Sequence, residues 1–171
     1  SDDHDASQQL TRSLLEIKPR HIALIGARPE LSVSQARASG FEDALEGFEG
    51  SVIIEHGDAF SRDCGQQLAS EMLDRLGYFP DALITTSYVL LQGVFDLLHQ
   101  RRLNPDQLHL GTFGDTQLLD FLPLPVNAMA QQHHLIAEKA LALALSAIEQ
   151  DQYEPGVHAI VRTFKQRIHE A

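Results

Sequence analysis

Residues 21–45 read HIALIGARPELSVSQARASGFEDAL, and they set a pattern that the rest of the chain repeats. The first seven, His21–Ala27, form a short apolar run that is typical of a buried strand. After the turn at Pro29 and Glu30, Ser32–Leu45 has the periodicity of a helix. A strand followed closely by a helix is the unit from which parallel sheets are built.

The same alternation extends in both directions along the chain. We expect helices at Asp5–Ile17, Ser61–Leu76, Tyr88–Arg101, Gln117–Phe121 and His134–Glu149, and strands at Ser51–Glu55, Ala82–Thr86, Leu108–Phe113, Pro125–Ala130 and Val157–Phe164. Strands separated by helices pair in parallel through right-handed crossovers. The predicted fold class is therefore α/β: an open, doubly wound parallel sheet in a three-layer α/β/α arrangement. Such sheets bind ligands beyond the carboxyl ends of their strands.

Length and charge limit the classes of function. The chain has 171 residues, of which 43% are hydrophobic, which suits one domain or one lobe of a larger protein. Its formal net charge of −11 would repel a phosphate backbone, so we expect no nucleic-acid binding by this segment itself. The lone Cys64 cannot form an internal disulfide, which favours a reducing compartment and an inert packing role.

Signals for membranes, export and catalysis are missing from the sequence. No apolar run approaches the roughly 18 residues of a membrane span, and the acidic start predicts no signal peptide. The phosphate loop, dinucleotide loop, HExxH, CxxC and GxSxG motifs do not occur. His133 and His134 would diverge on a helix and make a poor metal pair. We therefore expect no enzyme, no cofactor and no metal.

Four segments at the predicted strand ends carry a family resemblance. They are SQARASGF (34–41), TTSYVLLQGV (85–94), GTFGD (111–115) and VNAMAQ (126–131). Their order and spacing resemble the carboxyl half of the effector-binding domain in the LacI/GalR family of transcription regulators. The resemblance covers essentially the whole chain, although each motif alone is weak.

The resemblance implies a lobe of the periplasmic-binding-protein type. Residues 1–130 would form the carboxyl lobe, and residues 131–171 would form a crossover, a helix and a strand that return to an amino lobe. That lobe and a DNA-binding helix-turn-helix domain would both lie outside this sequence. The last helix is apolar nearly all round, as expected if it packs against the absent lobe.

The resemblance also implies an effector. PELSVS (29–34), TTSYVLLQGVFD (85–96) and TFGDTQLLDFL (112–122) are most similar to the fructose-responsive branch of the family. The implied effector is fructose 1-phosphate, with fructose 1,6-bisphosphate weaker, and its binding would close two lobes of a cytoplasmic homodimer and alter operator binding. Five residues are expected in the core and the subunit interface: Leu90, Leu91, Val94, Leu97 and Leu98. Two alternatives are a periplasmic sugar-binding protein and a small α/β sugar-phosphate enzyme.

Arg37 and two serines are candidate ligand contacts around the first predicted strand end. The family uses an arginine at the position of Arg37 to hold effector oxygens, and a guanidinium can donate two parallel hydrogen bonds. The alternative is a surface ion pair with Glu42 or Asp43. Ser32 and Ser34 lie at a helix start whose free N–H groups suit an anion, while Ser32 can equally be the N-cap.

Phe60 and Ser87 are further candidates from the resemblance. In relatives an aromatic at the position of Phe60 packs against the sugar ring, and the alternative is a core side chain. Ser87 takes the place of an asparagine that contacts ligand in many relatives. Its alternative role is the N-cap of the helix from Tyr88.

Asp115 and Gln131 complete the candidate set. Relatives carry an aspartate that binds sugar hydroxyls where an ungapped match places Gly114, with Asp115 one position later. Loss of one carboxylate suits a phosphorylated effector, because a phosphate carries nearly two negative charges. The alternative role of Asp115 is the N-cap of Gln117–Phe121. Gln131 is expected at the inter-lobe crossover, as a hinge or cleft residue.

Overall fold

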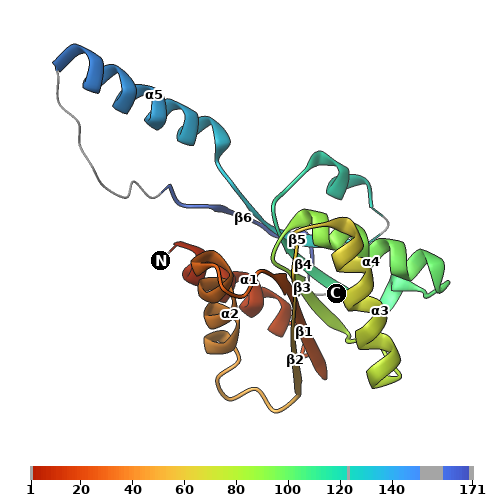
Figure 1. The fold of residues 1–171 in the computed structure, drawn as a ribbon. Coiled ribbons are helices and arrows are strands. Elements are labelled where there is room, and N and C mark those ends of the chain that lie inside the picture. Colours follow the sequence, from red (N-terminus) through yellow and green to blue (C-terminus); the bar gives the residue numbers. More distant parts are fainter. Residues whose placement is uncertain (1, 123, 151–159, 170–171) are drawn as a thin grey trace.

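The computed structural model describes residues 2–122, 124–150 and 160–169 (Figure 1). The strands are β1 (His21–Ala27), β2 (Ser51–Gly57), β3 (Ala82–Thr85), β4 (His109–Phe113), β5 (Val126–Ala130) and β6 (Thr163–Lys165). The helices are α1 (Asp2–Leu15), α2 (Ser32–Ala44), α3 (Arg62–Leu76), α4 (Tyr88–Gln100) and α5 (His133–Gln150), with short 3-10 helices η1 (Pro105–Gln107) and η2 (Gln117–Phe121). The predicted α/β class is confirmed.

The six strands form one sheet in the order β2-β1-β3-β4-β5-β6. The first five pair in parallel, as predicted, but β6 pairs antiparallel with β5. The reason lies in the path of the chain: α5 leaves from the carboxyl end of β5, and the returning chain enters the sheet from that same end (Figure 1). Of the predicted strand Val157–Phe164, only Thr163 and Phe164 are in a described strand, and residues 157–159 lie outside the described residues.

Helices cover both faces of the sheet, as the alternation predicts (Figure 1). On one face, Leu10 of α1 and Phe41 of α2 pack with Leu24 in one buried cluster. On the other, side chains of α3 and α4 pack with Ile25 in a second cluster. Leu24 and Ile25 are neighbours in β1 and point to opposite faces, because side chains alternate along a strand.

Glycine permits the close approach of α3 and α4. A Cβ atom placed on Gly93 would lie 2.0 Å from the carbonyl oxygen of Arg62, and one on Gly65 would lie 2.3 Å from that of Leu90. Both distances are too short for any larger residue without a shift of backbone. This contact fixes the position of α4 against α3. Helix α4 begins at Tyr88, close to the carboxyl end of the sheet.

The five leucine and valine residues of α4 lie inside this chain. Leu90, Leu91, Val94 and Leu97 have no exposed surface, and Leu98 is 6% exposed. The prediction of a core role is confirmed for all five. Their predicted part in a subunit interface remains a prediction, and Leu98 lines an apolar cavity beside the end of α4.

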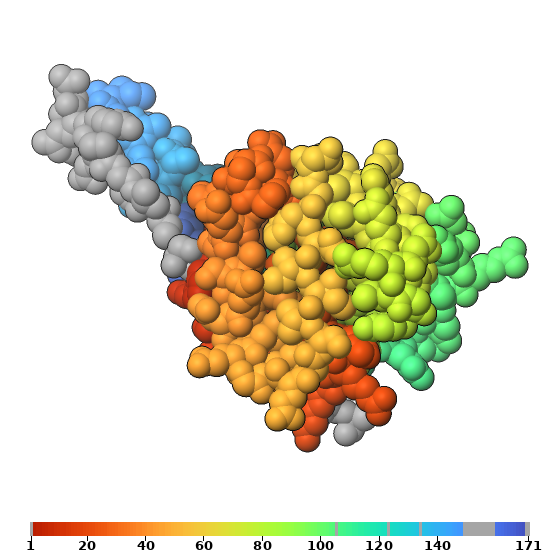
Figure 2. Space-filling view, turned by 60° about the horizontal axis from the view of Figure 1, so that its bottom comes forward, coloured from red at the N-terminus to blue at the C-terminus, as the bar shows by residue number. Residues whose placement is uncertain are grey.

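Helix α5 projects from the body of the molecule (Figures 1 and 2). Its apolar side chains are exposed along its length, with Leu141 at 61% and Ile148 at 79%. Within the described part of the chain, no helix combines the length and apolarity that crossing a membrane requires.

Candidate functional site

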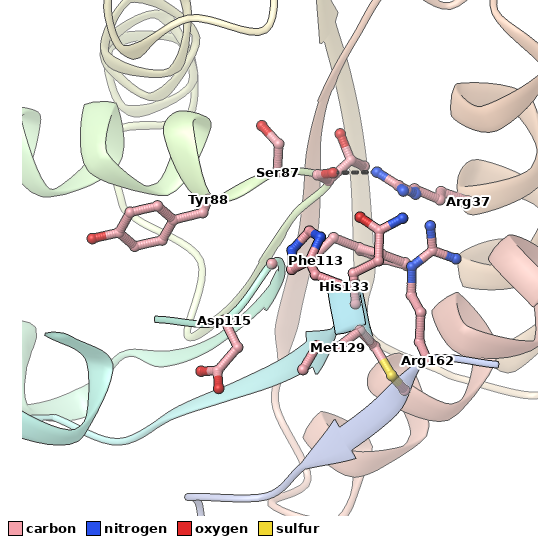
Figure 3. Close-up of a pocket in the computed structure, with 12 residues that line it drawn as sticks. Arg37, Ser87, Tyr88, Phe113, Asp115, Met129, His133 and Arg162 are labelled. Carbon is pink, nitrogen blue, oxygen red and sulfur yellow. Dashed lines mark hydrogen bonds between the residues drawn. The ribbon is translucent and has the colours of Figure 1, made fainter. Parts of the chain in front are cut away.

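A cavity of about 390 Å³ opens at the carboxyl end of the sheet (Figure 3). Its volume lies in the range of small-molecule sites, and its place is the one where open α/β sheets bind ligands. Its walls come from α2, the ends of β3, β4 and β5, and the starts of α4, α5 and β6. The lining residues are Arg37, Thr86, Ser87, Tyr88, Phe113, Gly114, Asp115, Met129, Ala130, Gln131, His133 and Arg162.

Arg37 is held in a fixed orientation at one side of this cavity. Its Nε donates to Asp3 Oδ1 at 2.8 Å, and its Nη1 donates to the carbonyl oxygen of Thr86 at 2.6 Å. Its guanidinium carbon lies 4.2 Å from the centre of the Phe113 ring, within the range of a cation–π contact. No described residue accepts a hydrogen bond from its Nη2, which leaves that donor for a ligand.

Burial and charge act on Arg37 in opposite directions. Burial lowers the pKa of its guanidinium, while the carboxylate of Asp3 opposes that change. A guanidinium stays charged in proteins, so Arg37 presents a cation to the cavity. The alternative ion pair with Glu42 or Asp43 is wrong, because the arginine turns inward to Asp3 of α1.

Arg162 is a second cation in the cavity, and sequence reasoning missed it. Its Nη1 lies 2.7 Å from Asp2 Oδ2 and 3.1 Å from Asp3 Oδ1. Its guanidinium carbon lies 5.7 Å from the centre of the Phe113 ring, the ring that Arg37 also contacts. No sequence pattern indicated Arg162, because this residue directly precedes β6 and comes close to the cavity only through the pairing of β6 with β5.

Asp115 lies at the opposite side of the cavity. Its Oδ1 accepts from Arg167 Nη2 at 2.8 Å and its Oδ2 accepts from Lys165 Nζ at 3.3 Å. The capping alternative for Asp115 is wrong, because the hydroxyl of Thr116 caps η2 by accepting from the N–H of Leu118 at 3.4 Å. Asp115 lines the cavity while both of its carboxylate oxygens accept from these two cations, and its binding role remains a prediction.

Ser87 and Gln131 both line the cavity. The Ser87 hydroxyl also caps α4, because it accepts from the N–H of Leu90 at 3.5 Å. The capping alternative for Ser87 is confirmed, and its ligand contact remains a prediction. Gln131 follows β5 directly and precedes α5, and its role at an inter-lobe crossover remains a prediction.

Three predicted residues do not line the cavity. The Ser34 hydroxyl is buried and donates to the carbonyl oxygen of Ala27 at 2.6 Å, which ties α2 to the end of β1. Ser32 is exposed and makes no capping bond, because the N-cap of α2 is Leu31; the capping alternative for Ser32 is wrong. Phe60 packs against the core, as its alternative predicted. Their predicted ligand roles find no support in the geometry of this cavity.

The cavity has two chemically different sides (Figure 3). Arg37, Arg162 and His133 form a basic side, and Asp115 and Tyr88 form a side of carboxylate and hydroxyl groups. Such an arrangement suits a small polar ligand that combines an anionic group with hydroxyls. Among the described residues, no group of three or more His, Cys, Asp and Glu side chains is placed to hold a metal ion.

A parallel α/β sheet with a polar cavity beyond the carboxyl ends of its strands is the architecture of a ligand-binding domain. The chain belongs to the family of periplasmic binding protein-like domains, whose family model matches residues 11–167. The predicted resemblance to LacI/GalR transcription regulators is also confirmed by similarity to individual proteins.

Two curated relatives and one solved structure define that similarity. The fructose operon regulatory protein of Vibrio cholerae is 40% identical over 169 residues, which are 98% of this chain and 51% of that protein. The catabolite repressor/activator of Escherichia coli K12 is 36% identical over 167 residues, 96% of this chain and 50% of that protein. The chain thus spans about half the length of these relatives. The Cra transcriptional dual regulator of Pseudomonas putida, solved in complex with fructose 1-phosphate, is 69% identical with a TM-score of 0.94, over 99% of this chain and 63% of that one.

Proposed function

We propose that this chain is the effector-binding part of a LacI/GalR-family transcription regulator and that its effector is fructose 1-phosphate. The observation that carries the proposal is the cavity with two arginines on one side and Asp115 on the other. The similarity to the regulator solved with fructose 1-phosphate supports the same ligand. The protein would bind this ligand without chemical turnover.

The two sides of the cavity suggest how the ligand lies. The phosphate would face Arg37 and Arg162, where guanidinium groups can donate paired hydrogen bonds to its oxygens. The sugar hydroxyls would face Ser87, Tyr88 and Asp115, which offer hydroxyl and carboxylate groups. Fructose 1,6-bisphosphate would bind more weakly, because its second phosphate would face the carboxylate side.

The domain division follows from the same proposal. Residues 1–130 would form one lobe, and residues from 131 onward would cross to a second lobe. The exposed apolar surface of α5 supports this, because Leu141, Leu145 and Ile148 would otherwise face water. The described strand Thr163–Lys165 pairs with β5, so we place it with the first lobe. Ligand binding would close the two lobes, to the extent that the closed state binds it more tightly.

We further propose a homodimer that contacts operator DNA through a separate amino-terminal domain, in the cytoplasm. An apolar cavity of about 780 Å³ lies beside the end of α4 and is bordered by Phe95, Leu103 and Leu122. Nearby in sequence, Leu118 and Phe121 of η2 are 62% and 83% exposed. A second copy of this chain is the occupant that a symmetric regulator requires. The net charge of −11 is consistent with DNA contact by another domain.

A thermal-shift panel on the full-length protein that carries this chain tests the proposal. Fructose 1-phosphate at about 100 times its dissociation constant should stabilise the folded protein by about 2.7 kcal/mol. Fructose 6-phosphate and free fructose should give smaller shifts. Release of inorganic phosphate during incubation would instead indicate an enzyme and overturn the proposal.

A further inference from the structure

The chain after β6 places Arg167 behind Asp115, with all three guanidinium nitrogens in hydrogen bonds. Arg167 Nη2 donates to Asp115 Oδ1 and to Asp120 Oδ1, both at 2.8 Å. Its Nε donates to Asp120 Oδ1 at 2.9 Å, and its Nη1 donates to the carbonyl oxygen of Val126 at 3.0 Å. Every nitrogen of the guanidinium is therefore used, and the Arg167 side chain is only 10% exposed.

The backbone around Arg167 is anchored independently of any ligand. The N–H groups of Arg167 and Ile168 donate to Asn127 Oδ1 at 2.8 Å and 2.9 Å. Asn127 is fully buried, and its Nδ2 donates to Ser13 Oγ at 2.9 Å. These bonds link the backbone at Arg167 through Asn127 of β5 to α1, and they fix the place from which the guanidinium extends.

The charges in this cluster balance one another. Lys165 Nζ lies 3.3 Å from Asp115 Oδ2 and 3.5 Å from Asp120 Oδ1, so two cations face two carboxylates. Burial by itself would lower the pKa of Arg167, but hydrogen bonds with the two aspartates outweigh it and raise that pKa. Asp115, which is 17% exposed, is the member of the cluster that lines the cavity.

An unbalanced carboxylate at this place would oppose a phosphorylated ligand. A phosphate monoester carries nearly two negative charges at neutral pH, and like charges a few ångströms apart in a protein site repel strongly. A carboxylate whose charge is balanced from behind can still accept hydrogen bonds from sugar hydroxyls.

We propose that Arg167 and Lys165 are positioning residues for the effector: they fix the orientation of the Asp115 carboxylate and balance its charge, so that it can bind sugar hydroxyls close to a phosphate. The inference rests on the proposed function. It makes the segment from Lys165 at the end of β6 to Arg167 a determinant of specificity for phosphorylated over unphosphorylated sugars, although neither residue lines the cavity.

A double-mutant cycle in the full-length protein tests the inference, with fructose 1-phosphate as the titrant. Arg167→Met should weaken binding by about tenfold or more, because it leaves Asp115 short of one cation. Arg167→Met combined with Asp115→Asn should recover most of that loss, since the charge to be balanced is gone. Arg62→Met is the matched control: it removes an arginine that pairs with Asp96 between α3 and α4, and it should leave affinity unchanged.

The outcomes separate the inference from the proposed function. Failure of the wild-type protein to bind would overturn both. If the wild-type protein binds fructose 1-phosphate and Arg167→Met binds it equally well, the inference alone is overturned. The same follows if Arg167→Met weakens binding and the added Asp115→Asn does not restore it. If circular dichroism shows that Arg167→Met is unfolded, Lys165→Met takes its place in the same double-mutant cycle. We again expect weaker binding that the added Asp115→Asn restores.

Discussion

The guanidinium of Arg37 lies over the ring of Phe113, with 4.2 Å between its central carbon and the ring centre. This contact joins the second helix to the last residue of β4. Arg162 approaches the same ring at 5.7 Å. The position of one buried aromatic side chain therefore governs where both cations of the cavity stand.

Replacement of Phe113 by leucine should lower stability and disturb the arginines together. Phe113 is 3% exposed, so the smaller side chain leaves a partial cavity and removes two cation–π contacts. We expect a loss of about 1–3 kcal/mol in the free energy of unfolding, measured by urea titration. Val52→Ala, at a position that is 44% exposed, is the control and should change stability by about 0.5 kcal/mol or less. Equal losses in both variants would contradict this account.

Gly93→Ala should destabilise the protein in spite of the higher helix propensity of alanine. The added Cβ would meet the carbonyl oxygen of Arg62 at 2.0 Å, and backbone cannot move aside as a flexible side chain does. We expect a net loss of about 1–3 kcal/mol in thermal or urea unfolding. Gln92→Ala, one residue earlier in α4, controls for helix propensity; a stability gain at Gly93 would show that the two helices can separate freely.

His4 should make stability fall as the pH rises. Hydrogen bonds to Asp5 and then Asp43 raise its pKa above 6.5 in the folded protein. The folded state therefore binds the proton more tightly than the unfolded state. The stabilisation is fully present below pH 6.5 and is lost as the pH rises through the folded pKa. An NMR titration of the His4 ring should give a midpoint above 6.5, and a midpoint at or below that value would contradict the two hydrogen bonds.

His56 should act in the opposite direction. Burial lowers its pKa below 6.5, and its buried Nε2 has no hydrogen-bond partner among the described residues. The folded state therefore favours the neutral form of His56. This preference stabilises the folded protein above pH 6.5, and the stabilisation is lost as the pH falls below 6.5 through the folded pKa. The free energy of unfolding, measured by urea titration at several pH values, should fall toward acid pH in the wild-type protein, and His56→Gln should remove that fall. It should also fall toward alkaline pH, and His4→Gln should remove that second fall. A His56→Gln variant with an unchanged acid side would exclude this role.

The sequence was sufficient for the sheet and its helices, because strand and helix periodicities alternate without interruption from His21 to Ala130. It was insufficient for β6, whose direction depends on the path of the chain after α5 and not on its own residues. Ser87, Asp115 and Gln131 could be placed at the cavity because they closely follow strand ends, and Arg37 because it lies in the second turn of the helix that follows β1.

Long-range contacts explain most of what sequence reasoning missed at the site. Arg162 and Arg167 reach the site from a distant segment and carry no local signal. Phe60 also follows a strand end, but its side chain packs, partly buried, against the core, and its ligand role remains a prediction. A position after a strand predicts nearness to the ligand edge, but packing decides where the side chain points.

The most direct test of the central claim is a calorimetric titration of fructose 1-phosphate into the full-length protein, beside an Arg37→Ala variant. Fructose 6-phosphate and free fructose are the ligand controls. We expect saturable binding of the 1-phosphate and its loss in the variant, because Arg37 is a fixed cation with a free donor in the cavity. Absence of heat with every sugar phosphate, or equal binding by the variant, would contradict the account.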